Sequence, residues 1–395
     1  SETVTSNATQ PETLCHYLKA RKATCITFTI IVVALITIIP VVIHIRKRIS
    51  NVDTSTTEII VTTTKEPTLT SNSRTTSTTP VSTLSSQSTW SQNAITIFGS
   101  QAGTSGSSLS LLNNPIGMYY DGPNNMLIVS DFGNHRILQF SINYPPSVAT
   151  VIAGGNDYGC KMNQFTVTIG VAFDSSRQLY VADSDCNRTI KFPANSNSTT
   201  SGTCVGSVSQ PQNLCINPST GDIYVASYDD NAVYKFIGGS ETAVVAAGGN
   251  GDGNALNQFA GPNGVYYDYL YTNALYVTDT RNHRVMKFPP DSTSATYGTI
   301  VAGDDEAGSG ANQLNNPRST LIDSQGTLYI SDGDNNRVQR WLQNSSSGTT
   351  VVGGTKGTAS NQLDFPEQIL FDKYNNLLVV DRSNNRVQRF KLTRC

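Results

Sequence analysis

The chain has 395 residues, which by length alone is enough for two or three domains. Only 14% of them are charged, compared with about 25% in an average globular protein, and the formal net charge is -2. From residue 94 onward, 19 Lys and Arg stand against 24 Asp and Glu. This balance disfavours a phosphate-binding surface, so we expect no nucleic-acid partner.

The first feature along the chain is an apolar run at residues 26–45, interrupted mainly by threonine. At about 1.5 Å per helical residue the run spans roughly 30 Å, the thickness of the hydrocarbon core of a bilayer. It starts too far from the N-terminus for a signal peptide, and the basic residues 46–48 follow it in place of a cleavage site. We therefore predict a transmembrane helix over residues 24–46, preceded by a short cytosolic tail at residues 1–23.

The next segment, residues 47–93, is rich in Ser and Thr, which make up 24 of the 44 residues from 50 to 93. Such a composition buries too little apolar surface to offset chain entropy and is typical of a disordered, O-glycosylated stalk. Three N-glycosylation sequons follow it, at Asn187, Asn197 and Asn344. Basic residues are balanced on the two sides of the apolar run, so the stalk and the sequons decide the orientation. We expect a single-pass type II glycoprotein with an extracellular C-terminal part; a cytosolic linker is the alternative.

A repeat occupies residues 94–395. Six copies of a Tyr-Val-x-Asp type segment recur, with spacings of 52, 44, 52, 53 and 49 residues between their anchor positions. Those anchors are Asp131, Asp183, Ser227, Asp279, Asp332 and Asp381. Each copy contains four short β-rich runs separated by Gly, Asn and Asp, and four antiparallel strands in about fifty residues are typical of a β-propeller blade. The sequence therefore predicts an all-β, six-bladed β-propeller.

The two ends of the repeat region predict how the ring closes. The last copy stops after its third strand, whereas an extra strand at residues 95–98 precedes the first copy. We expect that strand to complete the last blade, because closure removes the sheet edges that invite aggregation. The aromatic residue that ends the third strand of each copy is expected to fill the core between blades.

The repeat resembles the NHL repeat. In the fourth copy the motif reads PNGV at residues 262–265, YVTD at 276–279 and NHRVMKF at 282–288. The resemblance covers residues 94–394 and implies a six-bladed propeller, but one fold hosts many functions. Some cytosolic relatives bind RNA or act in ubiquitin transfer; this chain has no Cys/His array for a RING site before the propeller.

An aspartate and an arginine five residues apart recur in five of the six copies. A short turn between the second and third strands places the two residues opposite each other on one sheet face. We expect the carboxylate to hold the turn and to pair with the guanidinium as a structural clasp. The pairs are Asp131 with Arg136, Asp183 with Arg188, Asp279 with Arg284, Asp332 with Arg337, and Asp381 with Arg386. The third copy has Ser227 and Ala232 instead and so lacks both partners.

Long variable segments separate the repeats. Because strand directions alternate, these segments and the turns between second and third strands belong to the same face of the ring. Loops on such a face usually carry binding function, since they vary without disturbing the scaffold. The segments are residues 154–164, 248–258, 303–313 and 353–362, and the connection into the third copy is shortened, which predicts a notch.

Signals for a cofactor are weak. Asp304, Asp305 and Glu306 form an acidic triplet, and Asp332, Asp334 and Asn336 imitate the start of a calcium loop that lacks its later glycine and glutamate. We expect no bound metal, with calcium as the alternative. The resemblance extends to lyases that hold zinc through several histidines, but His135 and His283 fall in opposite blades and cannot share a metal. No nucleophile elbow is present, and we assign no catalytic residue.

Five cysteines lie in the repeat region. Cys160 and Cys186 fall on adjacent loops of one face, so we predict a disulfide between them, and a second one between Cys204 and Cys215. Cys395 is left to stay free or to link two chains.

These observations favour a membrane-anchored propeller that binds an extracellular protein or glycan through its loop-rich face. The alternative is a membrane-tethered hydrolase or lyase that uses a metal in the central channel. The ligand and the oligomeric state are left open by the sequence.

Overall fold

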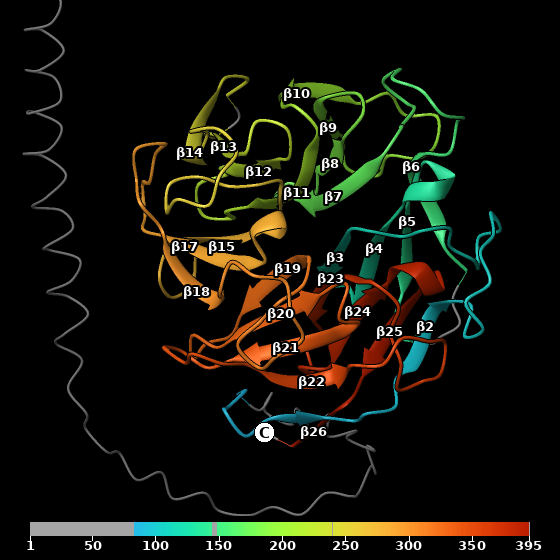
Figure 1. The fold of residues 1–395 in the computed structure, drawn as a ribbon. Coiled ribbons are helices and arrows are strands. Elements are labelled where there is room, and N and C mark those ends of the chain that lie inside the picture. Colours follow the sequence, from blue (N-terminus) through green and yellow to red (C-terminus); the bar gives the residue numbers. More distant parts are fainter. Residues whose placement is uncertain (1–82, 144–147, 239, 395) are drawn as a thin grey trace, which may run out of the picture. The chain divides into compact units, whose positions relative to one another are not determined.

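The computed structural model describes residues 83–143, 148–238 and 240–394. They form six four-stranded antiparallel sheets, which confirms the predicted six-bladed propeller. The first strands of the blades surround the centre of the ring and the outermost strands lie at its rim (Figure 1). The predicted tail at residues 1–23, the predicted membrane helix at 24–46 and most of the predicted stalk lie outside the described residues. Within the described ranges, no helix is long and apolar enough to cross a membrane.

The blades follow one another along the chain. Blades 1 to 3 consist of β3 Met118–Asp121, β4 Met126–Asp131, β5 Arg136–Ser141 and β6 Thr150–Gly154; β7 Thr168–Phe173, β8 Leu179–Asp183, β9 Arg188–Phe192 and β10 Thr203–Ser207; and β11 Pro211–Ile216, β12 Ile223–Ser227, β13 Ala232–Phe236 and β14 Ala243–Gly248. Blades 4 to 6 consist of β15 Pro262–Asp268, β16 Ala274–Asp279, β17 Arg284–Phe288 and β18 Thr299–Gly303; β19 Pro317–Ile322, β20 Leu328–Asp332, β21 Arg337–Trp341 and β22 Thr349–Gly353; and β23 Pro366–Phe371, β24 Leu377–Asp381 and β25 Arg386–Phe390 with β2 Ile95–Gly99.

The ring closes as the sequence predicts. Strand β2 pairs antiparallel with β25, with Ile95 opposite Arg389 and Gly99 opposite Arg386. It supplies the fourth strand of blade 6, so the first and last parts of the ring are joined by main-chain hydrogen bonds (Figure 1).

The predicted C-terminal end of the stalk, at residue 93, is wrong. Residues 84–93, expected to be disordered, pack on the propeller. Strand β1 (Thr89–Trp90) pairs with β26 (Leu392–Arg394), and the Trp90 side chain is only 3% exposed. Its indole stacks on Phe371 and meets Tyr329 edge-on, while its Nε1 donates to the Asn375 carbonyl at 2.9 Å. Burial of this one aromatic side chain thus orders a segment whose composition is otherwise polar.

The hydrophobic core lies between neighbouring blades. Each sheet is covered on both faces, so the second strands read as nearly continuous apolar runs and are buried along their whole length in most blades. The aromatic residues that end the third strands are at most 2% exposed and belong to these clusters, as expected. They are Phe140, Phe192, Phe236, Phe288, Trp341 and Phe390.

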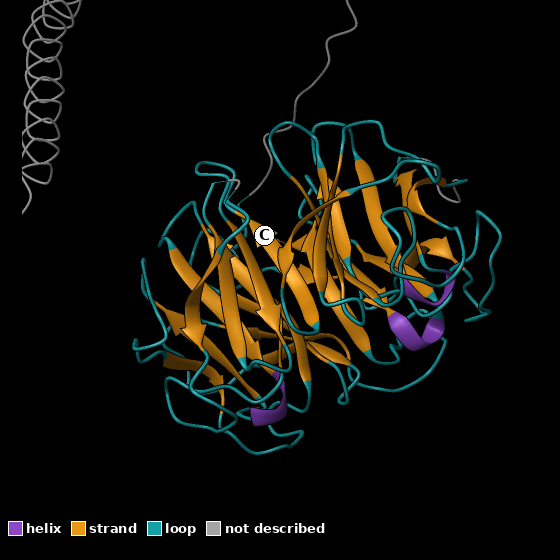
Figure 2. Cartoon of the chain, turned by 90° about the horizontal axis from the view of Figure 1, so that it is seen from above, coloured by secondary structure: helices purple, strands orange, loops and turns teal. Residues whose placement is uncertain are grey.

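The ring has two different faces. The turn face carries the turns between second and third strands, which include the 3-10 turns η1 Phe132–Asn134, η2 Thr280–Asn282 and η3 Arg382–Asn384. These three turns lie on one side of the sheets in Figure 2. The hairpin face carries the connections between first and second strands. Because each first strand starts at the turn face and ends at the hairpin face, the channel runs between them.

We predict that deleting residues 94–99 abolishes the single cooperative unfolding transition, because blade 6 then loses its outer strand and the ring its closure. Thermal unfolding followed by circular dichroism measures this. A deletion of residues 50–77, which removes no described strand, is the control and should leave the melting curve unchanged. An unchanged curve for the first deletion would contradict the closure.

Candidate functional site

All five predicted Asp–Arg pairs form in the structure. In each pair the arginine lies opposite the aspartate at the start of the third strand, and the two charged groups approach within 2.7–2.8 Å. Both members are buried: the Asp279 and Arg284 side chains are fully inaccessible, and so are those of Asp381 and Arg386. A buried pair of this kind is stabilising only when its remaining hydrogen-bonding capacity is filled.

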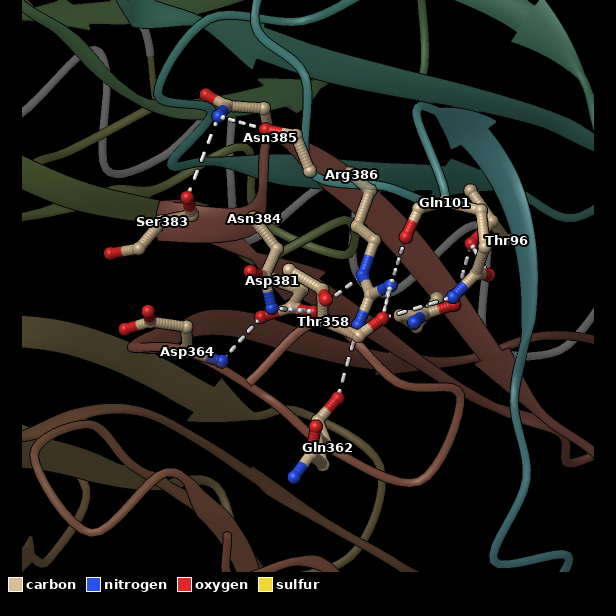
Figure 3. Close-up of polar contacts among 12 residues, drawn as sticks. Thr96, Gln101, Thr358, Gln362, Asp364, Asp381, Ser383, Asn384, Asn385 and Arg386 are labelled. Atoms are coloured by element: carbon tan, nitrogen blue, oxygen red, sulfur yellow. Dashed lines mark hydrogen bonds and ion pairs between the residues drawn. The ribbon is translucent and has the colours of Figure 1, made fainter. Parts of the chain in front are cut away.

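The rest of each guanidinium holds the loop that leads into the same blade. In blade 6, Arg386 donates to the carbonyl oxygens of Thr358, Ala359 and Gln362, at 2.6 to 3.1 Å (Figure 3). The arginines of blades 1, 2, 4 and 5 bind three carbonyls of their own inter-blade loops in the same way. The clasp therefore ties the second-to-third turn, the third strand and the incoming loop together.

The carboxylate of each clasp aspartate also accepts hydrogen bonds from its surroundings. Asp381 accepts the backbone N–H of Asp364 at 2.7 Å and the amide of Asn384 at 2.9 Å. Burial raises the pKa of Asp279 to about 6, against the hydrogen bonds from Ala260, Asn282 and Arg284, which act to lower it. The pKa values of Asp131, Asp332 and Asp381 are raised for the same first cause. This repeated arrangement holds the turn and the incoming loop of its blade in place.

Blade 3 lacks the clasp, because its incoming connection is too short to offer the carbonyl groups that the arginine binds in the other blades. Its incoming connection consists only of residues 208–210, between β10 and β11. Ser227 replaces the aspartate and donates to the Ser209 carbonyl at 2.6 Å, and Ala232 replaces the arginine. The joint loss of both partners follows from the shortened loop, which the spacing of 44 residues already indicated.

The disulfide between Cys160 and Cys186 forms, with the two Cα atoms 5.7 Å apart. In the four other blades that carry the clasp, the residue equivalent to Cys186 is an asparagine whose amide donates both to the clasp aspartate and to a glycine carbonyl of the incoming loop, as Asn134 does to Asp131 and Gly106. Asn282, Asn335 and Asn384 repeat these two bonds. Cys160 directly follows the corresponding glycine, Gly159, so the disulfide replaces this hydrogen bond by a covalent one.

The second predicted disulfide is wrong: Cys204 and Cys215 are free. Cys204 belongs to β10, the outermost strand of blade 2, whereas Cys215 belongs to β11, the innermost strand of blade 3. The two cysteines are close in the sequence but not in the fold, because between them the chain crosses from the outer strand of blade 2 to the channel strand of blade 3. Cys395 lies outside the described residues.

The long inter-blade segments are less variable in structure than in sequence. All four make the same turn, in which a glycine N–H donates to a carbonyl six residues on and a short parallel bridge follows. The glycines are Gly159, Gly253, Gly308 and Gly357. These segments therefore form a repeated, ordered connection between neighbouring blades.

The predicted metal candidates serve as hydrogen-bonding groups. Asp305 pairs with Arg284 at 3.1 Å, and Asp304 accepts from Asn312 at 2.9 Å. No group of three or more His, Cys, Asp or Glu placed to hold a metal occurs in the described part of the chain. In the calcium-like segment Asp332 is engaged in its clasp, and Asn336 accepts the N–H of Phe365.

The remaining predicted residues lie on turns and loops. His135 and His283 occupy equivalent left-handed positions after η1 and η2, and His283 Nδ1 accepts the Asn316 N–H at 3.2 Å. Asn187 takes the equivalent position in blade 2 and accepts from the backbone N–H of Gln210 at 2.7 Å. Asn187, Asn197 and Asn344 are all exposed, as glycosylation requires.

Sequence reasoning missed a polar cluster where the channel meets the turn face. Arg318 and Arg382 both bind the carboxylate of Glu367, at 3.0 and 2.6 Å, and both guanidinium groups lie against the ring of Phe365, at 5.5 and 5.6 Å from its centroid. We refer to these four residues as the mouth cluster. Glu367 is 2% exposed, whereas the side chains of Arg318 and Arg382 are 13% and 24% exposed.

Phe365 has an unusual backbone. Its φ of +55° lies in the left-handed region, which is rarely adopted by a bulky side chain. The equivalent positions before the first strands of blades 1, 3, 4 and 5 also have a positive φ. They carry Asn114, Gln210, Gly261 and Asn316, and glycine and asparagine tolerate this conformation best. No sequence signal short of aligning the repeats could have identified this position.

Comparisons with known proteins agree with this architecture. The family described as the NHL repeat matches residues 112–140, which run from the loop before β3 into β5. This match and the six-bladed ring support the resemblance to NHL propellers. The chloroplastic protein SUPPRESSOR OF QUENCHING 1 of Arabidopsis thaliana is 23% identical over 266 residues, covering 58% of this chain and 25% of that protein. The chain thus spans about a quarter of the length of this relative.

Solved structures show the same fold at low identity. An auxiliary nutrient binding protein from Bacteroides thetaiotaomicron is similar with a TM-score of 0.59 and 14% identity, covering 78% of both chains. A structural genomics protein of unknown function from the same organism gives 0.58 and 16%, covering 76% of both chains. A gluconolactonase from Xanthomonas campestris gives 0.53 and 12%, covering 78% of this chain and 97% of that one.

We predict that the double variant Cys160→Ser/Cys186→Asn is more stable than Cys160→Ser/Cys186→Ala by about 1 kcal/mol, the usual net contribution of one hydrogen bond. The asparagine restores the bond to the glycine carbonyl that Asn134 makes in blade 1. The alanine variant should be less stable than the wild type by about 3 kcal/mol, as expected for the loss of a disulfide, and the asparagine variant by about 2 kcal/mol. Urea unfolding under identical conditions measures the three free energies. Equal stability of the two double variants would contradict the equivalence.

Proposed function

We propose that the protein is a cell-surface binding protein whose propeller takes up a protein or carbohydrate ligand on the turn face, at the mouth cluster. Ligand binding by such a ring is supported by the fold, since a nutrient binding protein is built in the same way. At 14% identity that similarity supports a binding role without naming a ligand.

The observation that carries the proposal is the strained Phe365 held between two arginines. The four equivalent positions with a positive φ otherwise carry residues of small or polar type, so the fold itself does not require an aromatic side chain there. Strain of this kind costs of order 1–3 kcal/mol and clusters at ligand-binding and active sites. A phenylalanine kept in this conformation is therefore better explained by recognition than by folding.

The chemistry of the mouth cluster indicates what it would recognise. Two guanidinium groups and one carboxylate leave a single positive charge, and both arginines keep part of their side chains in contact with solvent. The buried Glu367 fixes the guanidinium planes while leaving other N–H groups available, and planar guanidinium groups bind carboxylates in a bidentate manner. Phe365 adds an apolar ring surface beside them. Acidic side chains of a protein, or acidic and hydroxyl groups of a glycan, suit this combination.

Location at the cell surface rests on the sequence, and on the exposure of the three sequons in the folded ring. The Cys160–Cys186 disulfide adds support, because disulfides persist mainly in oxidising compartments.

We predict that the full chain expressed in animal cells is N-glycosylated. Treatment with peptide N-glycosidase should increase its electrophoretic mobility, and Asn344→Gln should remove part of that shift while leaving the fold intact, because Asn344 is exposed. Labelling of intact cells through a C-terminal tag gives an independent readout. A chain without a glycosidase shift and without surface labelling would contradict the location.

We predict that Phe365→Asn and Arg382→Gln weaken ligand binding tenfold or more, the effect expected for central aromatic and arginine contacts. The purified full chain is applied to arrays of glycans and of extracellular proteins, and the affinity for each bound ligand is then measured with the variants. Phe365→Asn should keep or raise the melting temperature, because Asn114 and Asn316 adopt the same φ. Tyr374→Ala, on the hairpin face, is the matched control. Unchanged affinity in Phe365→Asn would refute the site.

A further inference from the structure

The channel contains a cavity of about 250 Å³ in the half nearer to the hairpin face. All six first strands contribute to its wall, with residues from the middle and the later part of each strand, such as Val171, Val265 and Leu370. The wall extends to Pro218 and Tyr269 in the hairpins, which are exposed. The cavity therefore opens on the hairpin face, opposite to the mouth cluster.

The other end of the cavity is closed. Five of the six residues at or equivalent to the second position of the first strands are almost inaccessible to solvent at the turn face, and the side chain of the sixth, Arg318, is 13% exposed. Ile116 and Ile169 are 5% and 6% exposed, Gln212 is 7%, and Asn263 and Glu367 are 2%. Gln212 and Asn263 are hydrogen-bonded to each other at 2.9 Å. Together with the mouth cluster, they cover this end of the cavity with polar side chains. The cavity is thus a pocket with one opening and is separate from the proposed site on the turn face.

The lining is apolar and carries no charged side chain. Aliphatic residues alternate with the rings of Tyr119, Phe173 and Tyr266, the kind of wall that favours an apolar ligand. Cys215 lies in this wall, and burial raises the pKa of its thiol to about 12. The thiol therefore stays protonated near neutral pH and is a wall group, not a nucleophile.

Two donors stand at the inner end of the pocket. The side-chain oxygen of Gln368 accepts the N–H of Met118 at 2.7 Å, and that of Asn213 accepts the N–H of Leu214 at 2.8 Å. These bonds orient both amides, and their NH₂ groups have no hydrogen-bond partner within the described residues. Both residues line the cavity, so a ligand with a hydrogen-bond acceptor at its buried end can use these donors.

Carboxylates surround the opening. The first strands of five blades end at or run into an aspartate whose oxygens hold the following hairpin, as Asp268 holds Leu270 and Asp372 holds Tyr374. They are Asp121, Asp174, Asp268, Asp323 and Asp372, with Asn217 at the equivalent position of blade 3. Only Asp121 is paired with an arginine among them, through Arg177 at 2.8 Å. This ring of negative charge disfavours an anionic ligand.

We propose that the pocket binds one small, uncharged, apolar molecule that carries a hydrogen-bond acceptor at its buried end. A cavity of about 150 Å³ holds benzene, so the volume here suits roughly a bicyclic aromatic or an isoprenoid of similar size. Apolar contact with the wall supplies the affinity, and the amides of Asn213 and Gln368 orient the acceptor. The site is independent of ligand binding at the mouth cluster.

The test uses 6-acetyl-2-dimethylaminonaphthalene, a neutral bicyclic probe with a carbonyl acceptor and an emission that shifts to the blue in apolar surroundings. The full chain should bind one probe molecule with a blue-shifted emission. Ala172→Phe adds a ring inside the cavity, and we expect at least a tenfold loss of affinity. Gln368→Met removes one donor but keeps the size of the side chain, so it should weaken binding about tenfold while the emission stays blue-shifted.

Controls separate pocket binding from adsorption and from misfolding. Tyr374→Ala alters an exposed residue of the hairpin face outside the pocket and should leave affinity unchanged. Phe365→Asn should also leave probe binding unchanged, which distinguishes this pocket from the mouth cluster. If Ala172→Phe does not fold, Val265→Phe fills the cavity from blade 4 instead of blade 2. The proposal is overturned if the wild type shows no saturable binding, or if a folded cavity-filling variant binds the probe as well as the wild type.

Discussion

The propeller depends on one repeated interaction: a buried guanidinium that binds an aspartate of its own blade and three carbonyl groups of the incoming loop. Strand pairing holds each blade together but does not fix one blade to the next. The apolar core between blades is non-directional, so it fixes the distance between two blades better than the angle between them. The clasp supplies direction, because a guanidinium has donors in a fixed planar arrangement. It places each loop, and with it the start of the following channel strand.

The exceptions to this repeat are informative. Blade 3 has neither partner because its connection is too short to need holding. Blade 2 keeps the ion pair but exchanges an asparagine bond for the Cys160–Cys186 disulfide. Blade 6 keeps the clasp and departs elsewhere, at Phe365, where an aromatic residue occupies a backbone conformation that other blades give to asparagine, glutamine or glycine. Of these departures, only the one at Phe365 lacks a structural reason, which is why it is the best candidate for function.

Most features that the sequence predicts recur from blade to blade, whereas most of those that it misses occur once. Blade number, ring closure and the Asp–Arg pairs follow from residues repeated at a constant offset. Trp90 was missed because a single aromatic residue in a Ser/Thr-rich segment gives no periodicity, although it packs between Phe371 and Tyr329. The mouth cluster and the channel pocket were missed for another reason. Each of their residues comes from a different strand, so only the closed ring brings them together.

The pairing of β1 with β26 determines how tension would enter the ring. Strand β1 is the first strand of the described residues, and Trp90 in it is the first large aromatic side chain to be buried in the propeller. A pull on the chain from its N-terminal side would strain the short β1–β26 ladder and the indole before it reaches β2. Strand β2 is the element whose release would open blade 6. Under such a pull, the contacts of Trp90 and β1 would therefore break before the pairing of β2 with β25, and the ring would stay closed.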